Sequence, residues 1–279
     1  MEFRDNIMSE TQIITAESEG LLPYFKKISR YRGLILKFAK RDLKIKYAQT
    51  YFGILWVLLQ PIPSVVIFSF FFGKLIQVDT GILPYPIFAL VGMTGWSYFI
   101  NLASGVGNCL IESQHVLKKI YFPKFILPLS KILVGAIDLA ISFFVIIAAM
   151  ILFRVTPSYT IVFFPLFFLL NVLAGFAIGI WVSALTFRFR DLQHVVPFIL
   201  NFSIWLTPVF YPTTILPQNL TYIMYFNPMA LVVAGYRFSL AGDIMPDSHL
   251  LISIIPTLII LVLGLLYFKK VEDEIADFI

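Results

Sequence analysis

The sequence is poor in charged residues and has only one cysteine. Charged residues make up 13% of the 279 residues and hydrophobic residues 59%, against about 25% and roughly 45–50% in soluble domains. With several apolar runs of about 20 residues or more, this composition predicts an all-α integral membrane protein. Cys109 alone excludes an intramolecular disulfide and a thiolate metal cluster, and we expect it to be a small apolar filler.

The sequence also lacks the common signatures of enzymes and nucleotide-binding proteins. It has no GxxxxGK[ST] phosphate-binding loop, no HExxH and no GxSxG motif. The histidines at positions 115, 194 and 249 are too scattered to indicate a metal site. The acidic run Glu272–Asp273–Glu274 is interpreted as part of a solvated tail. We therefore expect no catalytic residues, no metal and no cofactor in this chain.

The N-terminal region divides into an acidic segment and a basic one. Residues 1–22 carry five acidic residues and no apolar core of a signal peptide, so we expect a mobile cytoplasmic N-terminus. Residues 23–50 interleave nine lysines and arginines with apolar residues at near-helical spacing. This pattern predicts an amphipathic helix in the membrane interface, with a solvated basic arm as the alternative. The net charge of +5 thus indicates membrane lipids rather than nucleic acid as the partner.

Residues 51–268 are predicted to form a transmembrane domain of six spans, followed by a cytoplasmic tail at 269–279. The expected spans are Phe52–Ile76, Pro84–Cys109, Ile126–Phe153, Thr160–Phe187, Val195–Tyr211 and Leu250–Phe268. With both termini inside, only Lys74, Arg154 and Arg237 of the 21 lysines and arginines lie outside or at the outer boundary. This asymmetry favours the orientation with both termini in the cytoplasm.

The fifth span is interrupted before it is long enough for a comfortable crossing. Pro208 and Pro212 end it, and Asn227 and Pro228 follow in an aromatic-rich stretch that leads to Arg237. Non-helical backbone survives in lipid only where protein buries it or where it lines a wet cavity. Residues 208–247 are therefore predicted to form an external re-entrant region, with a short helix and an ordinary external loop as the alternative.

Two features within the spans concern packing and charge. Gly175, Gly179 and Ser183 recur every four residues and predict close helix packing, against either this subunit or another. Asp138 falls near the middle of the third span, where an ionisable group is a candidate functional residue. Because no second intramembrane charge is visible for a proton relay, the favoured interpretation is a hydrogen bond to a polar group on a neighbouring helix.

Four stretches together resemble the permease subunit of bacterial ABC-2 type polysaccharide exporters, the group that exports O-antigen, capsule and teichoic acid. They are RDLKIKY at 41–47 with FGILW at 52–56, FRFRDL at 187–192, TPVFYP at 207–212, and NPM at 227–229 with Tyr236–Arg237. In order and spacing they extend over about residues 30–270, and the six predicted spans agree with the resemblance.

The resemblance implies a bacterial inner-membrane half-transporter that moves a polyprenyl-pyrophosphate-linked glycan. Two copies would pair with two separate ATPase subunits, which would bind ATP and Mg and supply the P-loop absent here. The family docks its ATPase at a turn that matches 187–194, and a second contact would lie at 112–124. The coupling residues it implies are Arg188, Arg190, Asp191, Leu192 and His194, with Glu112 and His115.

The resemblance also implies sites for the two parts of the substrate. The lipid pyrophosphate and cytoplasmic gate would involve Arg41, Lys44, Lys46 and Tyr47, because cations on one interfacial helix make a charge-assisted site; nonspecific headgroup attraction is the alternative. Aromatic rings could stack on sugars in a wet channel, or could pack in the lipid-facing belt. The aromatic candidates are Tyr51, Trp56, Trp96, Tyr98, Trp205, Phe210 and Tyr211, alongside Tyr47.

Two other functions stay open from the sequence. One is an ABC-2 exporter of drugs or small lipids with the same fold, which would have a smaller and more closed cavity. The other is a membrane protein of glycan assembly that uses no ATP, which would purify without an ATPase.

Overall fold

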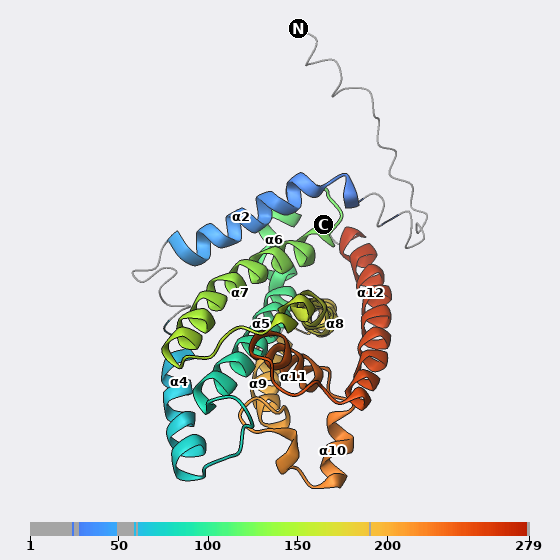
Figure 1. Ribbon diagram of the computed structural model, residues 1–279. Coiled ribbons are helices and arrows are strands. Elements are labelled where there is room, and N and C mark those ends of the chain that lie inside the picture. Colours follow the sequence, from blue (N-terminus) through green and yellow to red (C-terminus); the bar gives the residue numbers. More distant parts are fainter. Residues whose placement is uncertain (1–23, 25–27, 49–58, 60, 190, 278–279) are drawn as a thin grey trace.

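The computed structural model describes residues 24, 28–48, 59, 61–189 and 191–277, and within these ranges all regular structure is helical. Figure 1 shows the arrangement. The longer helices are α2 (Arg32–Ala48), α5 (Tyr85–Glu112), α7 (Ile126–Leu152), α8 (Phe164–Arg188) and α12 (Ile254–Asp277). The shorter ones are α4 (Pro61–Phe68), α6 (Gln114–Leu117), α9 (Leu192–Phe202), α10 (Gln218–Met224) and α11 (Pro228–Ala241).

Among the described residues, four helical segments are long and apolar enough to cross a membrane. They are Tyr85–Glu112, Ile126–Leu152, Tyr159–Arg188 and Ser248–Glu272, the last two beginning as 3-10 turns. Three apolar segments are shorter: Pro61–Leu75, Leu192–Leu206 and Pro228–Ala241. The prediction of an all-α multi-pass membrane protein is confirmed for the described chain. The prediction of six full spans is not confirmed. The expected first and fifth spans correspond to shorter helices, and residues 51–58 and 60 lie outside the described ranges.

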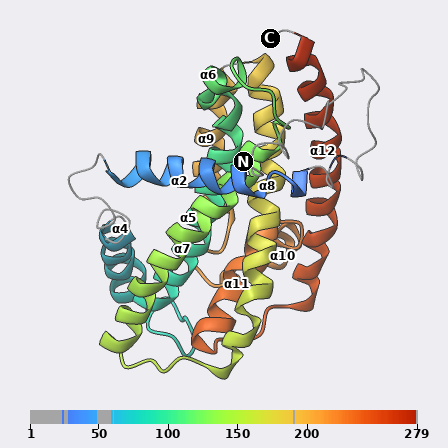
Figure 2. The same ribbon diagram turned by 90° about the horizontal axis from the view of Figure 1, so that it is seen from above.

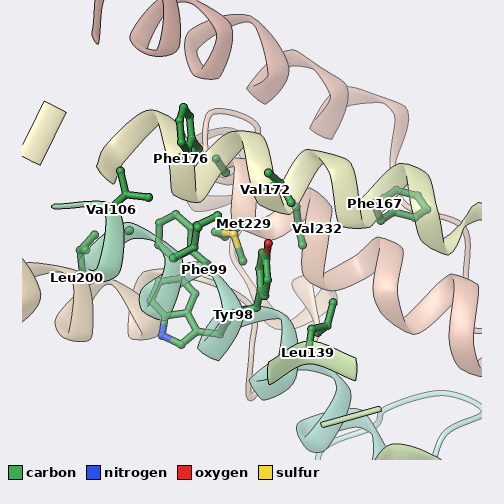
Figure 3. Packing of buried hydrophobic residues seen from close by; sticks show 14 of the residues in the cluster. Tyr98, Phe99, Val106, Leu139, Phe167, Val172, Phe176, Leu200, Met229 and Val232 are labelled. Carbon is green, nitrogen blue, oxygen red and sulfur yellow. The ribbon is translucent and has the colours of Figure 1, made fainter. Parts of the chain in front are cut away.

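Helix α5 is the centre of the molecule. In its most apolar stretch 72% of the residues are buried, against 22–39% in the other three long segments. It packs against α8, α7, α11 and α4, and Figure 3 shows Phe99 and Val106 of α5 on the side of α8 from which Val172 projects. A Cβ at Gly179 would lie 2.6 Å from the Cβ of Val106. The predicted stripe of small residues therefore faces α5 of the same chain.

Helix α2 lies across the bundle and along the first half of α7. In Figure 1 the two helices are side by side, and in Figure 2 α2 runs roughly perpendicular to the long axes of α8 and α12. Figure 2 also shows α6 at the same end of the bundle as the C-terminal ends of α8 and α12. We call this the α6 end.

The C-terminal region differs from the expected solvated tail. Helix α12 continues through the residues after Phe268 as far as Asp277, and Glu272 is buried with 8% of its surface exposed. The Glu272 carboxylate accepts hydrogen bonds from the Tyr24 hydroxyl and from the backbone N–H of Lys124, the latter at 2.6 Å. The prediction was wrong for Glu272, because hydropathy ends at Phe268 while the helix and its packing continue.

Candidate functional site

A cluster of charged side chains joins α2 to α5 and α7. Lys131 Nζ lies 2.9 Å from a carboxylate oxygen of Asp42 and 2.7 Å from one of Glu112. The Arg41 guanidinium lies 2.8 Å from the other Asp42 oxygen. Further along both helices, Lys46 Nζ lies 2.5 Å from Asp138. We call these six residues the α2–α7 charge cluster; each of its cations faces a carboxylate.

Asp138 has the hydrogen bond that the sequence suggested, together with an ion pair that it did not. The Tyr47 hydroxyl donates to one carboxylate oxygen and Lys46 approaches the other. The Asp138 side chain is only 9% exposed and lies halfway along an apolar helix, where an unpaired carboxylate would be costly. The end of α2 therefore reaches well past the start of α7 and contacts the middle of that helix.

Two adjoining cavities lie on either side of the Lys46–Asp138 pair. The first has a volume of about 550 Å³, and the whole charge cluster lines it. The second, of about 250 Å³, is lined mostly by hydroxyl, amide and aromatic side chains. We call them the charged cavity and the hydroxyl-lined cavity. Lys46, Asn101 and Asp138 line both, so the ion pair forms part of their common wall.

The interrupted fifth segment is held by side chains rather than by helical hydrogen bonds. Helix α9 ends at Phe202, a 3-10 turn extends to Leu206, and residues 207–212 are irregular. Arg237 of α11, which is 4% exposed, donates to the carbonyls of Pro208 (2.9 Å) and Val209 (2.6 Å) and to that of Phe88 on α5 (3.2 Å). Its guanidinium also stacks 3.3 Å from the Phe88 ring centroid.

Neighbouring groups complete this support. The Tyr85 hydroxyl donates to the Phe210 carbonyl at 2.8 Å. Asn227 caps α11 through the Met229 N–H, and its amide donates to the Thr207 hydroxyl at 2.9 Å. Pro228 is the first residue of α11 and half-buried Pro212 precedes a 3-10 turn. The interruption is thus compatible with a membrane environment, because protein buries its backbone and donates hydrogen bonds to its carbonyls.

The aromatic candidates separate into core and surface residues. Trp96, Tyr98 and Phe210 are 5%, 3% and 3% exposed, and Phe210 stacks on Phe68 with centroids 3.8 Å apart. Trp96 and Phe210 thus pack inside the chain and present no open ring face here. Trp205 is 54% exposed, and half-buried Tyr211 donates to its carbonyl at 3.0 Å. Tyr51 and Trp56 lie outside the described residues.

The residues expected to couple to an ATPase lie at the α6 end. Arg188 lies 2.6 Å from the Glu274 carboxylate, so α8 is fastened to α12. Asp191 and His194 are exposed around the start of α9, which begins at Leu192, and His115 is exposed on α6. Glu112 belongs instead to the charge cluster. Arg190 lies outside the described residues.

Comparison with known proteins identifies the family. The description "ABC-2 type transporter" belongs to the family profile that matches residues 34–240, well over half of the chain. The chain belongs to the ABC-2 type transporter family. This ABC-2 permease is thus the transmembrane component of a transporter, and ATP is bound by a separate ATPase subunit.

Relatives of the permease match it along nearly their whole length. It is 26% identical to an O-antigen export system permease protein RfbA of Klebsiella pneumoniae, over 88% of this chain and 94% of that protein. It is 25% identical to the protein of the same name from Myxococcus xanthus, over 90% and 97%. The polysialic acid transport protein KpsM of Escherichia coli is 22% identical, over 84% and 91%.

The structure of the permease also brings forward residues that the sequence reasoning passed over. Lys131 was counted only as a topology marker, and Asp42 and Asn101 were given no role. One signal was available: Lys131 and Asp138 are seven residues apart, which places both on the same face of a helix. That face could have been recognised as a charged stripe in an otherwise apolar span.

Proposed function

We propose that this chain is the permease of an ATP-driven exporter that moves a polyprenyl-pyrophosphate-linked polysaccharide across the bacterial inner membrane. The observation that supports it most directly is the charged cavity beside the middle of an apolar helix, in a chain whose relatives are named as O-antigen and polysialic acid permeases. A purely lipidic or apolar cargo would not require six charges there. A substrate with a charged linkage between lipid and sugar would.

The charged cavity is the proposed site of the pyrophosphate. Arg41, Lys46 and Lys131 supply cations on two helices, while exposed Lys44 lies nearby on α2. In the structure these three cations are neutralised by carboxylates. An entering pyrophosphate would compete with the carboxylates for the same cations, so binding would loosen the contact between α2 and α7.

The orientation and assembly follow from the same assignment. The α6 end collects Lys118, Lys119, Lys269 and Lys270 beside Arg188, which supports placing this end in the cytoplasm together with both termini. We propose a dimer of this chain with two ATPase subunits docked at the α8–α9 turn and α6. ATP-driven movement there would pass along α8 and α5 to the interrupted segment, residues 208–247, at the external mouth.

Depletion of the permease in its own cell tests the function. We expect polyprenyl-linked polymer to accumulate on the cytoplasmic side and surface glycan to fall. Complementation with Asp191→Ala should give a milder block, and Lys46→Met a stronger one, whereas Lys74→Met, an exposed cation remote from the charge cluster, should restore export. Unchanged surface glycan with no accumulated polymer would contradict the glycan assignment and favour a small-molecule exporter.

A further inference from the structure

The hydroxyl-lined cavity has no part in the route proposed above. It lies between α4, α5 and α7, beyond the Lys46–Asp138 pair from the charged cavity. Apart from that pair, its polar lining is Ser64, Thr94, Ser97, Tyr98, Asn101 and Ser142. A concentration of short hydroxyl groups around an amide, within an apolar helix bundle, marks a place built to contact something polar.

Helix α5 shows that this lining belongs to a longer pattern. Ser97 and Asn101 begin a polar row that continues through Ser104, Asn108 and Glu112, at helical spacing along one face. Ser97 and Asn101 are exposed in this chain, although the rest of α5 is its most buried long helix. Polar side chains on a spanning helix do not face lipid without cost, so this row borders a partner, water or substrate.

Tyr98 adds a second and independent observation. Its side chain lines the cavity and the residue is 3% exposed, yet its hydroxyl oxygen has no hydrogen-bond partner in the described chain. A buried hydroxyl that is left without a hydrogen-bond partner is destabilising. Tyr98 therefore adds unused hydrogen-bonding capacity to the wall of the cavity, a feature that suits contact with a sugar hydroxyl.

The two cavities match the two chemical parts of a lipid-linked glycan in the order in which they are joined. One is ionic and the other is lined by hydroxyls, and they share Lys46, Asn101 and Asp138. We propose that the hydroxyl-lined cavity is the binding subsite for the sugar residue attached directly to the pyrophosphate. The inference rests on the proposed function, and it assigns recognition of this first sugar to the permease itself.

The Lys46–Asp138 pair then acts at the junction. When a pyrophosphate takes Lys46, Asp138 loses its cation but can accept hydrogen bonds from sugar hydroxyls, as the ionised carboxylate is an acceptor with several lone pairs. Arg41, Lys131, Asp42 and Glu112 face the same space from the charged side. The two cavities thus recognise diphosphate and sugar together, and a ligand with only one of these parts occupies only one cavity.

The test uses the purified permease–ATPase complex in nanodiscs and three soluble probes. They are farnesyl pyrophosphate, and the same lipid carrying one N-acetylglucosamine or one galactose, titrated by calorimetry. For the wild type we expect at least one sugar-bearing probe to bind roughly 5- to 30-fold more tightly than farnesyl pyrophosphate, the effect of one or two net hydrogen bonds. Ser64→Ala with Ser97→Ala, two residues that line the hydroxyl-lined cavity and not the charged one, should bring the ratio close to one and leave the affinity for farnesyl pyrophosphate unchanged.

Two further variants distinguish the loss of sugar contacts from a general loss of structure. Tyr98→Phe removes only the hydroxyl and should lower the ratio on its own. Ser130→Ala, on α7 but outside the lining of both cavities, should keep the wild-type ratio, since its hydroxyl bonds only to the Leu127 carbonyl. A wild-type ratio of one for both sugars, or equal loss of all three probes in the variants, would overturn the subsite. The depletion experiment decides the export function separately, so either can fail alone.

Discussion

Replacing Arg237 should destabilise the permease more than any other single change at the interrupted segment. Arg237 donates to three buried carbonyls, those of Phe88, Pro208 and Val209, at 2.6–3.2 Å. Methionine fills much of the same volume but leaves all three acceptors unpaired. At about 1–1.5 kcal/mol for each hydrogen bond, Arg237→Met should cost about 3–5 kcal/mol. At roughly 2–4 °C per kcal/mol, the melting temperature should fall by roughly 6–20 °C.

The chain supplies its own reporter for this measurement. Cys109 is the only cysteine and is fully buried, so a thiol-reactive fluorophore reports unfolding in detergent without an engineered cysteine. Arg237→Lys serves as the matched variant: it keeps the charge but loses the planar fork and the stacking on Phe88, and should show an intermediate loss. A melting temperature for Arg237→Met within about 2 °C of the wild type would refute the assignment of Arg237 as the support of this segment.

Three further perturbations follow from the same structure. Gly179→Ala should cost about 1–3 kcal/mol, because its Cβ would meet a valine of α5 at 2.6 Å, whereas Gly33→Ala, with nothing within 4 Å, should be neutral or stabilising in the same thiol assay. Glu272→Leu should cost about 1–3 kcal/mol by removing the carboxylate that accepts from the buried Lys124 N–H, and Glu274→Leu, which removes a surface ion pair, should cost clearly less; equal losses would contradict this. Asp247 accepts hydrogen bonds from the backbone N–H and the side chain of His249, and these bonds lower the pKa of Asp247 in the folded protein. Its contribution to stability is therefore complete above its unfolded pKa of ~4. The contribution is lost as the pH falls through the lower folded pKa. Melting curves at several acidic pH values should therefore show a steeper loss for the wild type than for Asp247→Asn, while Asp247→Ala should also lose about 1 kcal/mol of helix capping at neutral pH.

The sequence predicted the features that depend on neighbouring residues. Apolar length located the long helices, and the prolines at 208 and 212 located the interruption, because a proline acts on the backbone beside it. The spacing of Gly175 and Gly179 predicted a close helix contact, although only the structure shows that the contact is with α5 of the same chain.

The sequence could not identify the partners of the charged and buried groups, because these partners come from distant parts of the chain. Asp138 was recognised as unusual, yet its cation, Lys46, is 92 residues away on a helix expected to stay at the interface. Arg237 was placed at the outer boundary, while its acceptors at 208 and 209 follow from how α11 folds back on α5. Hydropathy indicates whether a residue lies in an apolar or a polar environment. It does not identify the residue that pairs with its charge or hydrogen-bonding groups.

The hydrogen bond between Tyr24 and Glu272 has a consequence for biosynthesis. Tyr24 is the first residue that the structure describes, and its partner lies 248 residues later, beyond the last spanning helix. The same carboxylate also accepts from the backbone at Lys124. During translation α2 can pack against α7 early. Tyr24 can form its hydrogen bond with Glu272 only after α12 has left the ribosome and entered the membrane. The N-terminal region is thus among the first segments made, but its contact through Tyr24 is among the last to form. Truncation within α12 would remove this contact and leave those of α2 with α7 in place.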